Sequence, residues 1–263
     1  MLVEETTFTE CQSSGSGGAI FFGYDGNCAL AKVCGYKCST TNSNNCQFDR
    51  VYVTSSALTF VNTVNDSSIA YTSNSNNAHY TLCHGYGRII ACSVNVSNNN
   101  CSRYSGIYCY PYPSLSGSSG DASCLITFST FANNTCHTYY ICLLMDKGSA
   151  YKEITRCNVV RNTQQSRDSL GTIYSIGNLD IKYSCILDNS AKYDFYANSY
   201  TITISNCTRD ISPISVGKNR NCSFGKYFPS LHSFLFFSFS KARKGMLFKQ
   251  DVGWSKKWKS GDG

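Results

Sequence analysis

The sequence predicts an all-β protein in which short parallel strands stack as the rungs of a β-helix, a solenoid with loop insertions. A pair of short motifs recurs in the same order: an apolar segment ending at Asn, then a short apolar or aromatic strand. Alternation of apolar and polar residues is clear in several segments, and charged residues are only 15% of the chain. A recurring unit of this kind indicates stacking, because one unit cannot bury its apolar face alone.

The motif pair has four clear copies: 94–98 with 105–108, 128–134 with 140–142, 158–162 with 171–174, and 185–189 with 194–196. It also occurs near the start, where Phe8 opens the first motif and Gly17, Gly18, Ala19 and Ile20 form its partner. Asn tolerates the left-handed backbone of a tight bend. Equivalent Asn side chains can also form a ladder when rungs stack. We therefore assign the bends to the recurring asparagines Asn98, Asn133, Asn162 and Asn189, with Asn134 as a further motif residue.

Period-2 alternation sets the expected direction of the side chains. In 201–205 the Ile residues fall on one face and the Thr and Ser residues on the other, as in a half-buried strand. The pattern predicts one inward column of Phe131, Val160 and Leu187, and a second of Ile141, Ile173 and Phe195. The two adjacent glycines ease a sharp entry into the strand at Ile20. A β-sandwich with Asn-rich loops is the alternative, but it does not need the same two motifs in a fixed order.

Charge divides the chain into two parts. Residues 218–263 carry ten Lys and Arg against two Asp and Glu, whereas residues 1–217 carry thirteen against fourteen. We expect 1–217 to form the solenoid and 218–263 to be a basic, aromatic, poorly ordered tail outside it. The apolar run 228–239 contains Pro229 and His232, and is too short to cross a bilayer core of about 30 Å. Binding of membrane or nucleic acid by the tail is the less favoured interpretation.

Sixteen cysteines indicate an oxidising compartment unless they bind metal or form a catalytic set. Zinc is disfavoured because no paired CxxC motif is present and the chain has only four His. Several cysteines sit near the Asn bends: Cys92, Cys157, Cys185 and Cys207. Disulfides or stacked buried thiols are the two interpretations that remain. Six N-glycosylation sequons agree with a secreted protein: Asn65, Asn95, Asn100, Asn133, Asn206 and Asn221.

The beginning of the sequence has neither a basic n-region nor an apolar h-region, and a rung motif is under way by Phe8. A naked first rung exposes unpaired backbone groups, which repeat proteins normally cover with a cap. We therefore expect 1–217 to be truncated at its N-terminal end, so the missing signal does not argue for a cytoplasmic location.

The tetrapeptides Gly17-Gly18-Ala19-Ile20 and Phe131-Ala132-Asn133-Asn134 resemble the paired GGA(I/L/V) and FxxN motifs of chlamydial polymorphic outer membrane proteins. The stretches 155–162 and 205–210 are similar to a large trichomonad family of surface proteins with right-handed parallel β-helix repeats. The resemblance covers most of residues 1–210. It implies a right-handed parallel β-helix and an adhesin-like role at the cell surface, and it carries no catalytic residues. Family members usually have a signal peptide and a membrane helix, from which this sequence departs at both ends.

An enzyme is the main alternative, since β-helices also host polysaccharide lyases and hydrolases. Glycoside hydrolysis needs a pair of carboxylates, but the candidate Asp residues lie one to a rung: Asp180, Asp188, Asp194 and Asp210. We interpret His84 as a loop residue rather than a catalyst. The sequence thus favours a non-catalytic module at the cell surface or outside the cell that binds host glycans or proteins. We expect no cofactor, no metal and no nucleic acid, and membrane attachment only through segments that this chain lacks. A structural spacer is the remaining possibility.

Overall fold

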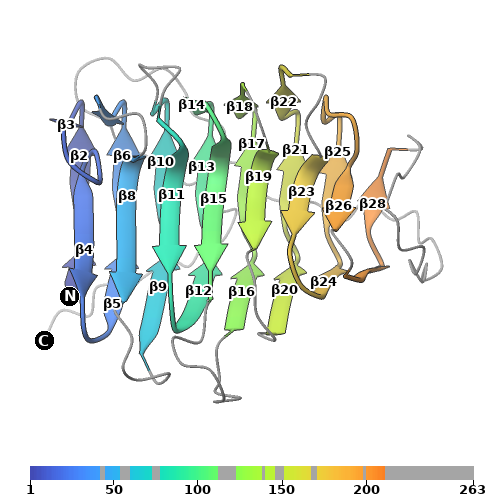
Figure 1. Cartoon of the computed structure of the whole chain (residues 1–263), viewed down its shortest axis with the longest axis horizontal. Coiled ribbons are helices and arrows are strands. Elements are labelled where there is room, and N and C mark those ends of the chain that lie inside the picture. Colours follow the sequence, from blue (N-terminus) through green and yellow to red (C-terminus); the bar gives the residue numbers. More distant parts are fainter. Residues whose placement is uncertain are drawn as a thin grey trace, which may run out of the picture. The chain divides into compact units, whose positions relative to one another are not determined.

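The computed structural model describes residues 1–41, 45–53, 60–72, 78–111, 123–137, 140–145, 151–166, 171–197 and 200–210, with the backbone alone for 140–145. All of them lie in the first of the two units into which the chain divides, Met1–Tyr227. The tail expected at 218–263 and the sequon at Asn221 lie outside the described residues. Every described strand pairs in parallel with a strand of an adjacent turn, so the predicted stack is confirmed (Figure 1).

Three long sheets form the sides of the stack. The first sheet contains β1 (Leu2–Glu4), β5 (Cys28–Ala31), β9 (Val61–Asn65), β12 (Arg88–Cys92), β16 (Ser123–Thr127), β20 (Tyr151–Thr155), β24 (Leu179–Lys182) and β27 (Ile202–Ser205). The second contains β2 (Thr7–Thr9), β6 (Cys34–Tyr36), β10 (Ser68–Ala70), β13 (Asn95–Ser97), β17 (Thr130–Ala132), β21 (Asn158–Val160), β25 (Cys185–Leu187) and β28 (Thr208–Arg209). The third contains β4 (Ile20–Tyr24), β8 (Cys46–Val53), β11 (Tyr80–Gly85), β15 (Tyr104–Tyr110), β19 (Tyr140–Met145), β23 (Gly171–Ser175) and β26 (Phe195–Ala197).

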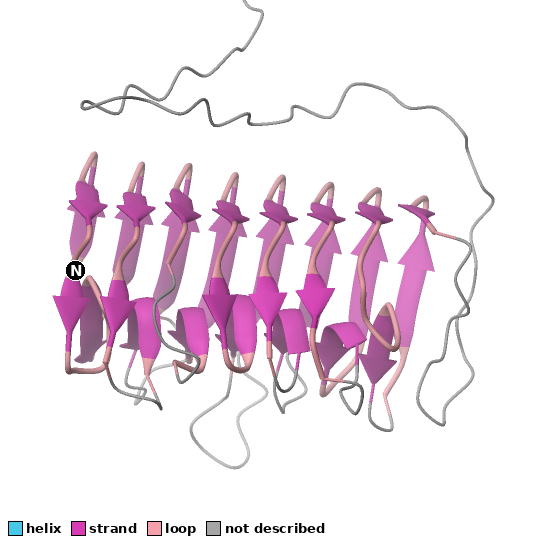
Figure 2. Cartoon of the chain, turned by 90° about the horizontal axis from the view of Figure 1, so that it is seen from above, coloured by secondary structure: helices cyan, strands magenta, loops and turns pink. Residues whose placement is uncertain are grey.

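Short strands join the second sheet to the third. They pair as β3 (Gln12–Ser13) with β7 (Ser39–Thr40), and as β14 (Asn100–Cys101) with β18 (Thr135–Cys136) and β22 (Thr163–Gln164). Successive turns of the chain lie side by side and repeat the same path (Figure 2). The sandwich alternative is excluded, because neighbouring strands are parallel and come from successive turns.

A single residue with left-handed backbone makes each bend on either side of the second sheet. Between the first and second sheets φ is 47° to 57° at the first-corner residues Glu5, Lys32, Asp66, Ser93, Phe128, Arg156, Tyr183 and Asn206. After the second sheet φ is 52° to 56° at the second-corner residues Glu10, Lys37, Tyr71, Asn98, Asn133, Arg161 and Asp188. Non-glycine residues adopt this region rarely, so the repetition indicates that stacking of the rungs imposes it.

The residue after each second corner carries the ladder. Asn134 Oδ1 accepts hydrogen bonds from the backbone N–H and the side-chain amide of Asn99, both at 3.1 Å. Asn134 Nδ2 donates to the carbonyl of Val96 at 2.9 Å and to Asn162 Oδ1 at 3.1 Å. Asn162 contacts Asn189 in the same way. The ladder therefore consists of Asn99, Asn134, Asn162 and Asn189.

This arrangement corrects part of the sequence interpretation. The bend and the ladder need two adjacent residues, because the left-handed residue directs its side chain outward. Asn98 and Asn133 make the bend, and Asn99 and Asn134 make the ladder. Asn162 is a ladder residue only, since Arg161 takes the left-handed conformation before it.

The inward columns are correct in part. Phe131 is fully buried and pairs with Val159, which pairs with Ile186. Val160 and Leu187 follow Val159 and Ile186 by one place and therefore lie on the opposite, outer face. There Val160 pairs with Ala132, and Leu187 pairs with Val160, so their predicted inward position is wrong.

The second predicted column also needs one replacement. Ile173 and Phe195 are register partners and both are fully buried in the core, as predicted. The backbone register places Leu143 beside Ile173, where Ile141 was predicted. A bulge in β19 between Tyr140 and Leu143 shifts the register, which alternation alone does not reveal.

The glycine pair near the start allows close approach of the neighbouring rung. A Cβ on Gly18 would lie 1.9 Å from the carbonyl oxygen of Gln47, and one on Gly17 would lie 2.0 Å from that of Ile20. Neither glycine has a positive φ. The reason for glycine is therefore steric contact with backbone rather than the sharp bend that the sequence suggested. Ala19 and Ile20 follow, with Ile20 buried in the core.

The ladder predicts a large effect of one substitution. Replacing Asn134 with Ala removes the side-chain hydrogen bonds to the Asn99 N–H and to the Val96 carbonyl, while the Asn162 amide oxygen keeps the Asn134 backbone N–H. Each buried unsatisfied group costs about 1–3 kcal/mol. We expect Asn134→Ala to lower the free energy of unfolding by about 3 kcal/mol or more in urea denaturation. The control, Asn133→Gly, keeps the left-handed bend and should change stability by less than about 1 kcal/mol; equal losses in both variants would contradict the ladder's role.

Candidate binding surface

The outer face of the third sheet gathers aromatic side chains that are far apart in the sequence. The register brings one outward residue from each strand whose side chains are described into a row: Phe21, Arg50, Cys83, Tyr108, Tyr174 and Tyr196. A second outward row contains Gly23, Tyr52, Gly85 and Tyr110. Figure 1 shows this sheet side by side from β4 to β26. Tyr80 and Tyr104 pair at the beginning of their strands, beside the rows.

Ring contacts connect the tyrosines of three consecutive rungs. Tyr80 stacks on Tyr104 with centroids 5.0 Å apart and an interplanar angle of 15°. Tyr108 lies 4.8 Å from Tyr80 and stacks against Tyr110 at 6.2 Å and 10°. We call the connected rings the tyrosine run: Tyr52, Tyr86, Tyr110, Tyr108, Tyr104 and Tyr80.

The run continues toward the N-terminal rungs through edge contacts. Tyr110 meets Tyr86 at 5.5 Å, and Tyr86 meets Tyr52 at 5.7 Å. Tyr52 lies across Gly85, where an added Cβ would come within 2.1 Å of the ring, and its hydroxyl is 3.2 Å from Cys83 Sγ. Burial raises the pKa of Tyr52 well above its usual range and that of Tyr80 to about 12. The phenol groups therefore stay protonated at neutral pH.

A second, smaller group lies at the C-terminal end of the same sheet. Tyr174 stacks on Tyr196 at 5.3 Å, and Tyr196 meets Tyr193 at 6.5 Å. The Lys192 ammonium lies 5.3 Å from the Tyr193 ring centroid. Between the two groups runs β19, for which the backbone alone is described.

Positive charge accompanies the rings. The Arg50 guanidinium lies 4.8 Å from the Tyr52 ring centroid, and its Nη1 donates to Asn45 Oδ1 at 2.8 Å. Burial, with a smaller effect of Arg103, lowers the pKa of His79 to about 4. His79 is therefore neutral at physiological pH. Among the outward residues that the structure describes in β4, β8, β11, β15, β23 and β26, none is a carboxylate.

The outer face of the first sheet holds the nearest arrangement to a catalytic carboxylate pair. Glu153 and Asp180 are register partners, and both contact Lys182 Nζ, at 3.0 and 3.3 Å. The Tyr151 hydroxyl also donates to Glu153. The assignment of Asp180, Asp188 and Asp194 to separate rungs is wrong, because all three lie in the turn that contains β24, β25 and β26, and Asp180 is not isolated, because Glu153 of the preceding turn lies beside it. Glu153 and Asp180 each lie three places before a left-handed bend, at Arg156 and Tyr183, so they occupy equivalent positions in successive rungs.

This cluster is poorly suited to acid–base chemistry. The hydrogen bond from Tyr151 lowers the pKa of Glu153, and Lys182 acts in the same direction. A general acid needs a raised pKa, whereas Glu153 is held ionised. The other candidates do not join the cluster: Asp210 Oδ2 accepts the Asp188 backbone N–H at 2.6 Å. Asp194 is largely buried, which raises the pKa of its carboxyl group.

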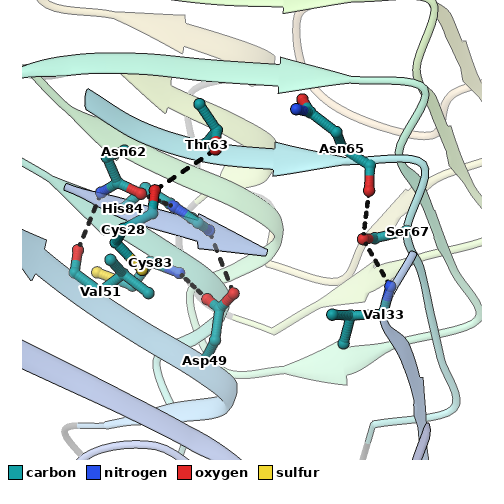
Figure 3. Close-up of polar contacts among 10 residues, drawn as sticks. All are labelled: Cys28, Val33, Asp49, Val51, Asn62, Thr63, Asn65, Ser67, Cys83 and His84. Atoms are coloured by element: carbon teal, nitrogen blue, oxygen red, sulfur yellow. Dashed lines mark hydrogen bonds and ion pairs between the residues drawn. The ribbon is translucent and has the colours of Figure 1, made fainter. Parts of the chain in front are cut away.

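His84 lies in β11 and is fully buried, so its assignment to a loop is wrong (Figure 3). Its Nδ1 is 2.7 Å from Asn62 Oδ1 and its Nε2 is 3.2 Å from Asp49 Oδ2. Asn62 Nδ2 points to the Val51 carbonyl, and Asp49 Oδ1 accepts the Cys83 N–H. Each ring nitrogen lies within hydrogen-bond distance of a side-chain oxygen, so both ends of the imidazole are held in place. The side chains of Asp49 and His84 are 0% exposed, so the cluster is structural rather than catalytic.

The cysteines whose side chains the structure describes are free thiols. Four of them, Cys11, Cys38, Cys157 and Cys207, directly follow a corner residue, where a small polar group bonds to backbone. Cys207 Sγ accepts the Ser184 N–H at 3.4 Å and donates to the Ser205 carbonyl. One rung earlier, Ser184 Oγ accepts the Cys157 N–H and donates to the Lys182 carbonyl. Cys157 follows a first corner as well, while Cys92 and Cys185 lie on outer faces. Of the two interpretations, buried thiols describe the structure.

The sequons differ in their access to solvent. Asn133 is exposed at a second corner and Asn206 is exposed at a first corner. Asn95 is buried and lies on the second sheet, while Asn65 and Asn100 have buried amide oxygens. A glycan therefore fits the folded surface at Asn133 and Asn206.

The described residues contain neither a candidate metal site nor a membrane-spanning helix. Within the described ranges no group of three or more His, Cys, Asp or Glu side chains could hold a metal ion. No helix in that part of the chain is long and apolar enough to span a membrane. Comparison with known proteins found no matching family model, no matching curated protein and no matching solved structure.

The buried contact between Asp49 and His84 predicts non-additive mutations. Replacing either residue with Leu removes the contact and leaves its polar partner in the core with only its other hydrogen bond, to the Cys83 N–H or to Asn62, which costs about 1–3 kcal/mol. The double variant removes both polar groups and should be less destabilised than the sum of the single variants, as measured by urea denaturation. Additive losses would show that the two side chains do not act as a pair.

The thiols predict slow alkylation of the folded protein. Burial raises the pKa of Cys28 and Cys157 to about 12 and that of Cys38 to about 11. Because the thiolate is the nucleophile, these residues should resist iodoacetamide at pH 8 in the reduced native protein and react readily in urea. Peptide mass spectrometry measures the labelling of each site. Rapid native labelling of Cys157 would contradict its buried position.

Proposed function

We propose that the protein is a non-catalytic recognition module, adhesin-like, that binds extended glycans or proteins through the outer face of the third sheet. The observation that carries this proposal is the tyrosine run, in which ring contacts extend from Tyr52 to Tyr80 across three rungs. Tyrosine combines an apolar ring with a polar hydroxyl and little side-chain entropy, which favours it at recognition surfaces.

The geometry of the solenoid supports an extended partner. Strands of a sheet lie about 4.8 Å apart, so equivalent side chains repeat at this interval along the stack. A chain of repeating units laid along the face makes many weak contacts that add through multivalency. The partially exposed tyrosines give such a chain both apolar contact and hydrogen-bond donors.

The cell surface or extracellular space is the proposed location. The resemblance of the repeats to surface proteins supports it, as do the solvent-accessible sequons at Asn133 and Asn206. Host cell-surface or matrix glycans and proteins are the proposed partners.

A polysaccharide-active enzyme is the second candidate, and the cluster of Glu153, Asp180 and Lys182 is the observation that favours it. Its weakness is that the hydrogen bond from Tyr151 and the charge of Lys182 lower the pKa of Glu153, whereas a general acid needs a raised pKa. A spacer without any ligand would leave the tyrosine run without a role.

The proposal is tested with two matched substitutions in the full chain. Tyr86 and Tyr183 both have left-handed backbone, with φ of 64° and 51°, but only Tyr86 belongs to the tyrosine run. Asn tolerates this conformation, so Tyr86→Asn and Tyr183→Asn each remove a ring and keep the bend. On a glycan array and on host cells we expect Tyr86→Asn to weaken binding at least fivefold, about 1 kcal/mol, and Tyr183→Asn to leave it unchanged.

The same preparations are assayed for release of reducing ends and unsaturated products from polysaccharides. Turnover that disappears in Glu153→Gln would replace the recognition proposal with the enzyme. Absence of both binding and turnover would leave the spacer.

A further inference from the structure

Two cysteine thiols occupy the positions that carry the Asn ladder in later rungs. Cys11 and Cys38 each directly follow a second-corner residue. The strand pairs before and after this corner, β2 with β6 and β3 with β7, keep one register, so the two cysteines are equivalent residues of adjacent rungs. The amide ladder begins only later, at Thr72, whose N–H and hydroxyl both donate to Asn99 Oδ1. At this corner the rungs of β2 and β6 are therefore joined by thiols where later rungs use amides.

The spacing of the two cysteines suits a disulfide. Equivalent residues of neighbouring strands lie about 4.8 Å apart, and bridged cysteines have Cα atoms about 4.4–6.8 Å apart. Cys38 Sγ reaches the preceding rung, where it lies 3.5 Å from the Phe8 carbonyl oxygen, and Cys11 Sγ lies 3.8 Å from the Thr9 carbonyl oxygen. Burial raises the pKa of the Cys38 thiol to about 11, and its side-chain hydrogen bond with Cys11 acts in the same direction. The two thiols are therefore in contact.

Cys11 also gives an oxidant access to the pair. It is partly exposed, whereas Cys38 is buried. The other partly exposed cysteines of the described residues have no described cysteine at the equivalent position of an adjacent rung: Cys34, Cys92, Cys185 and Cys207. Cys101 and Cys136 are register partners, but both are fully buried. Within the described ranges, solvent access and a stacked neighbouring thiol therefore coincide only at Cys11.

We propose that Cys11 and Cys38 form a disulfide when the folded protein meets a low-molecular-weight disulfide such as oxidised glutathione, and that this bridge ties the two rungs together. The Cys11 thiolate attacks one sulfur of oxidised glutathione, so that a mixed disulfide forms and one glutathione thiolate leaves. Cys38 then loses its proton and attacks Cys11 Sγ, which releases the second glutathione. Two protein thiols are oxidised, and one glutathione disulfide is reduced to two thiols. The second step is intramolecular, so proximity accelerates it.

The bridge puts a covalent bond in the place of the ladder. A disulfide that closes residues 11–38 into a loop restricts the unfolded chain. The oxidised protein should therefore resist urea better than the reduced protein. Serine cannot form the bridge, but it keeps a small side chain that bonds to backbone, as Ser184 does at a first corner.

The test treats the folded, reduced full chain with oxidised glutathione at pH 8. The reaction is stopped with acid, remaining thiols are blocked in urea, and bridges are assigned by fragment-ion mass spectrometry of unreduced peptides. We expect Cys11–Cys38 to be the main bridge and the urea midpoint to rise on oxidation. Cys38→Ser should instead retain glutathione on Cys11, because the second step then has no nucleophile.

The matched control is Cys34→Ser. Cys34 lies in the same rung as Cys38 and is partly exposed, but its register partners are Thr7 and Ser68. This variant should form the bridge as fully as the unaltered protein and gain the same resistance to urea, whereas Cys11→Ser should lose both. Urea unfolding of each reduced variant establishes that it is folded.

Several outcomes would overturn the inference. A main bridge between other cysteines, such as Cys101 and Cys136, would show that solvent access does not select the pair. Glutathione that stays on Cys11 of the unaltered protein would show that Cys38 does not reach it, and absence of any reaction would show that Cys11 is shielded. A bridge that forms without raising the urea midpoint would refute its role in tying the rungs.

Discussion

Two adjacent residues at each bend control the whole stack. One adopts the left-handed conformation, and the next places a hydrogen-bonding side chain under the equivalent residue of the neighbouring rung. In the rungs with Asn99, Asn134, Asn162 and Asn189, each amide bonds to the rung before it and most bond to the rung after it. A one-residue slip would break these bonds and turn every apolar side chain of the adjoining strands outward. The register of the core and of the outer faces therefore depends on the bends.

The same requirement explains why cysteine recurs so often as a free thiol. At a corner the buried position needs a small side chain that bonds to backbone, and Ser and Cys both satisfy this need. Cys38 and Asn134 each follow a second-corner residue and make the equivalent bond to the preceding rung. Cys38 Sγ donates to the Phe8 carbonyl at 3.5 Å, and Asn134 Nδ2 donates to the Val96 carbonyl. Polar groups deeper in the core, such as His84 and Asp49, are tolerated because they satisfy one another.

Sequence reasoning succeeded where the information is local. The repeat of Asn and apolar residues was enough to predict parallel stacking, since each copy carries the bend, the ladder residue and the strand. It failed by one place at Val160 and Leu187, because the bend and the ladder were assigned to a single Asn. At Arg161 and Asp188 the left-handed residue is not Asn at all, so the composition of the motif hides the position of the bend.

The surface was harder to foresee, because it depends on contacts between rungs. Tyr52, Tyr86 and Tyr110 come from different turns and meet only once the register is known. The contact of Glu153 with Asp180 was missed for the same reason. Alternation assigns a side to each residue, and it does not say which residue of the next rung lies beside it.

The regular spacing of a stack is the physical basis of the recognition role that we propose. Catalysis needs two or three groups with different pKa values to converge on one atom, whereas stacked rungs place equivalent residues side by side and at equal spacing. Where charges do meet on a flat outer face, as at Lys182, they neutralise one another. On the third sheet, tyrosines line up along the stack axis. We propose that such a face suits a partner that is itself repetitive.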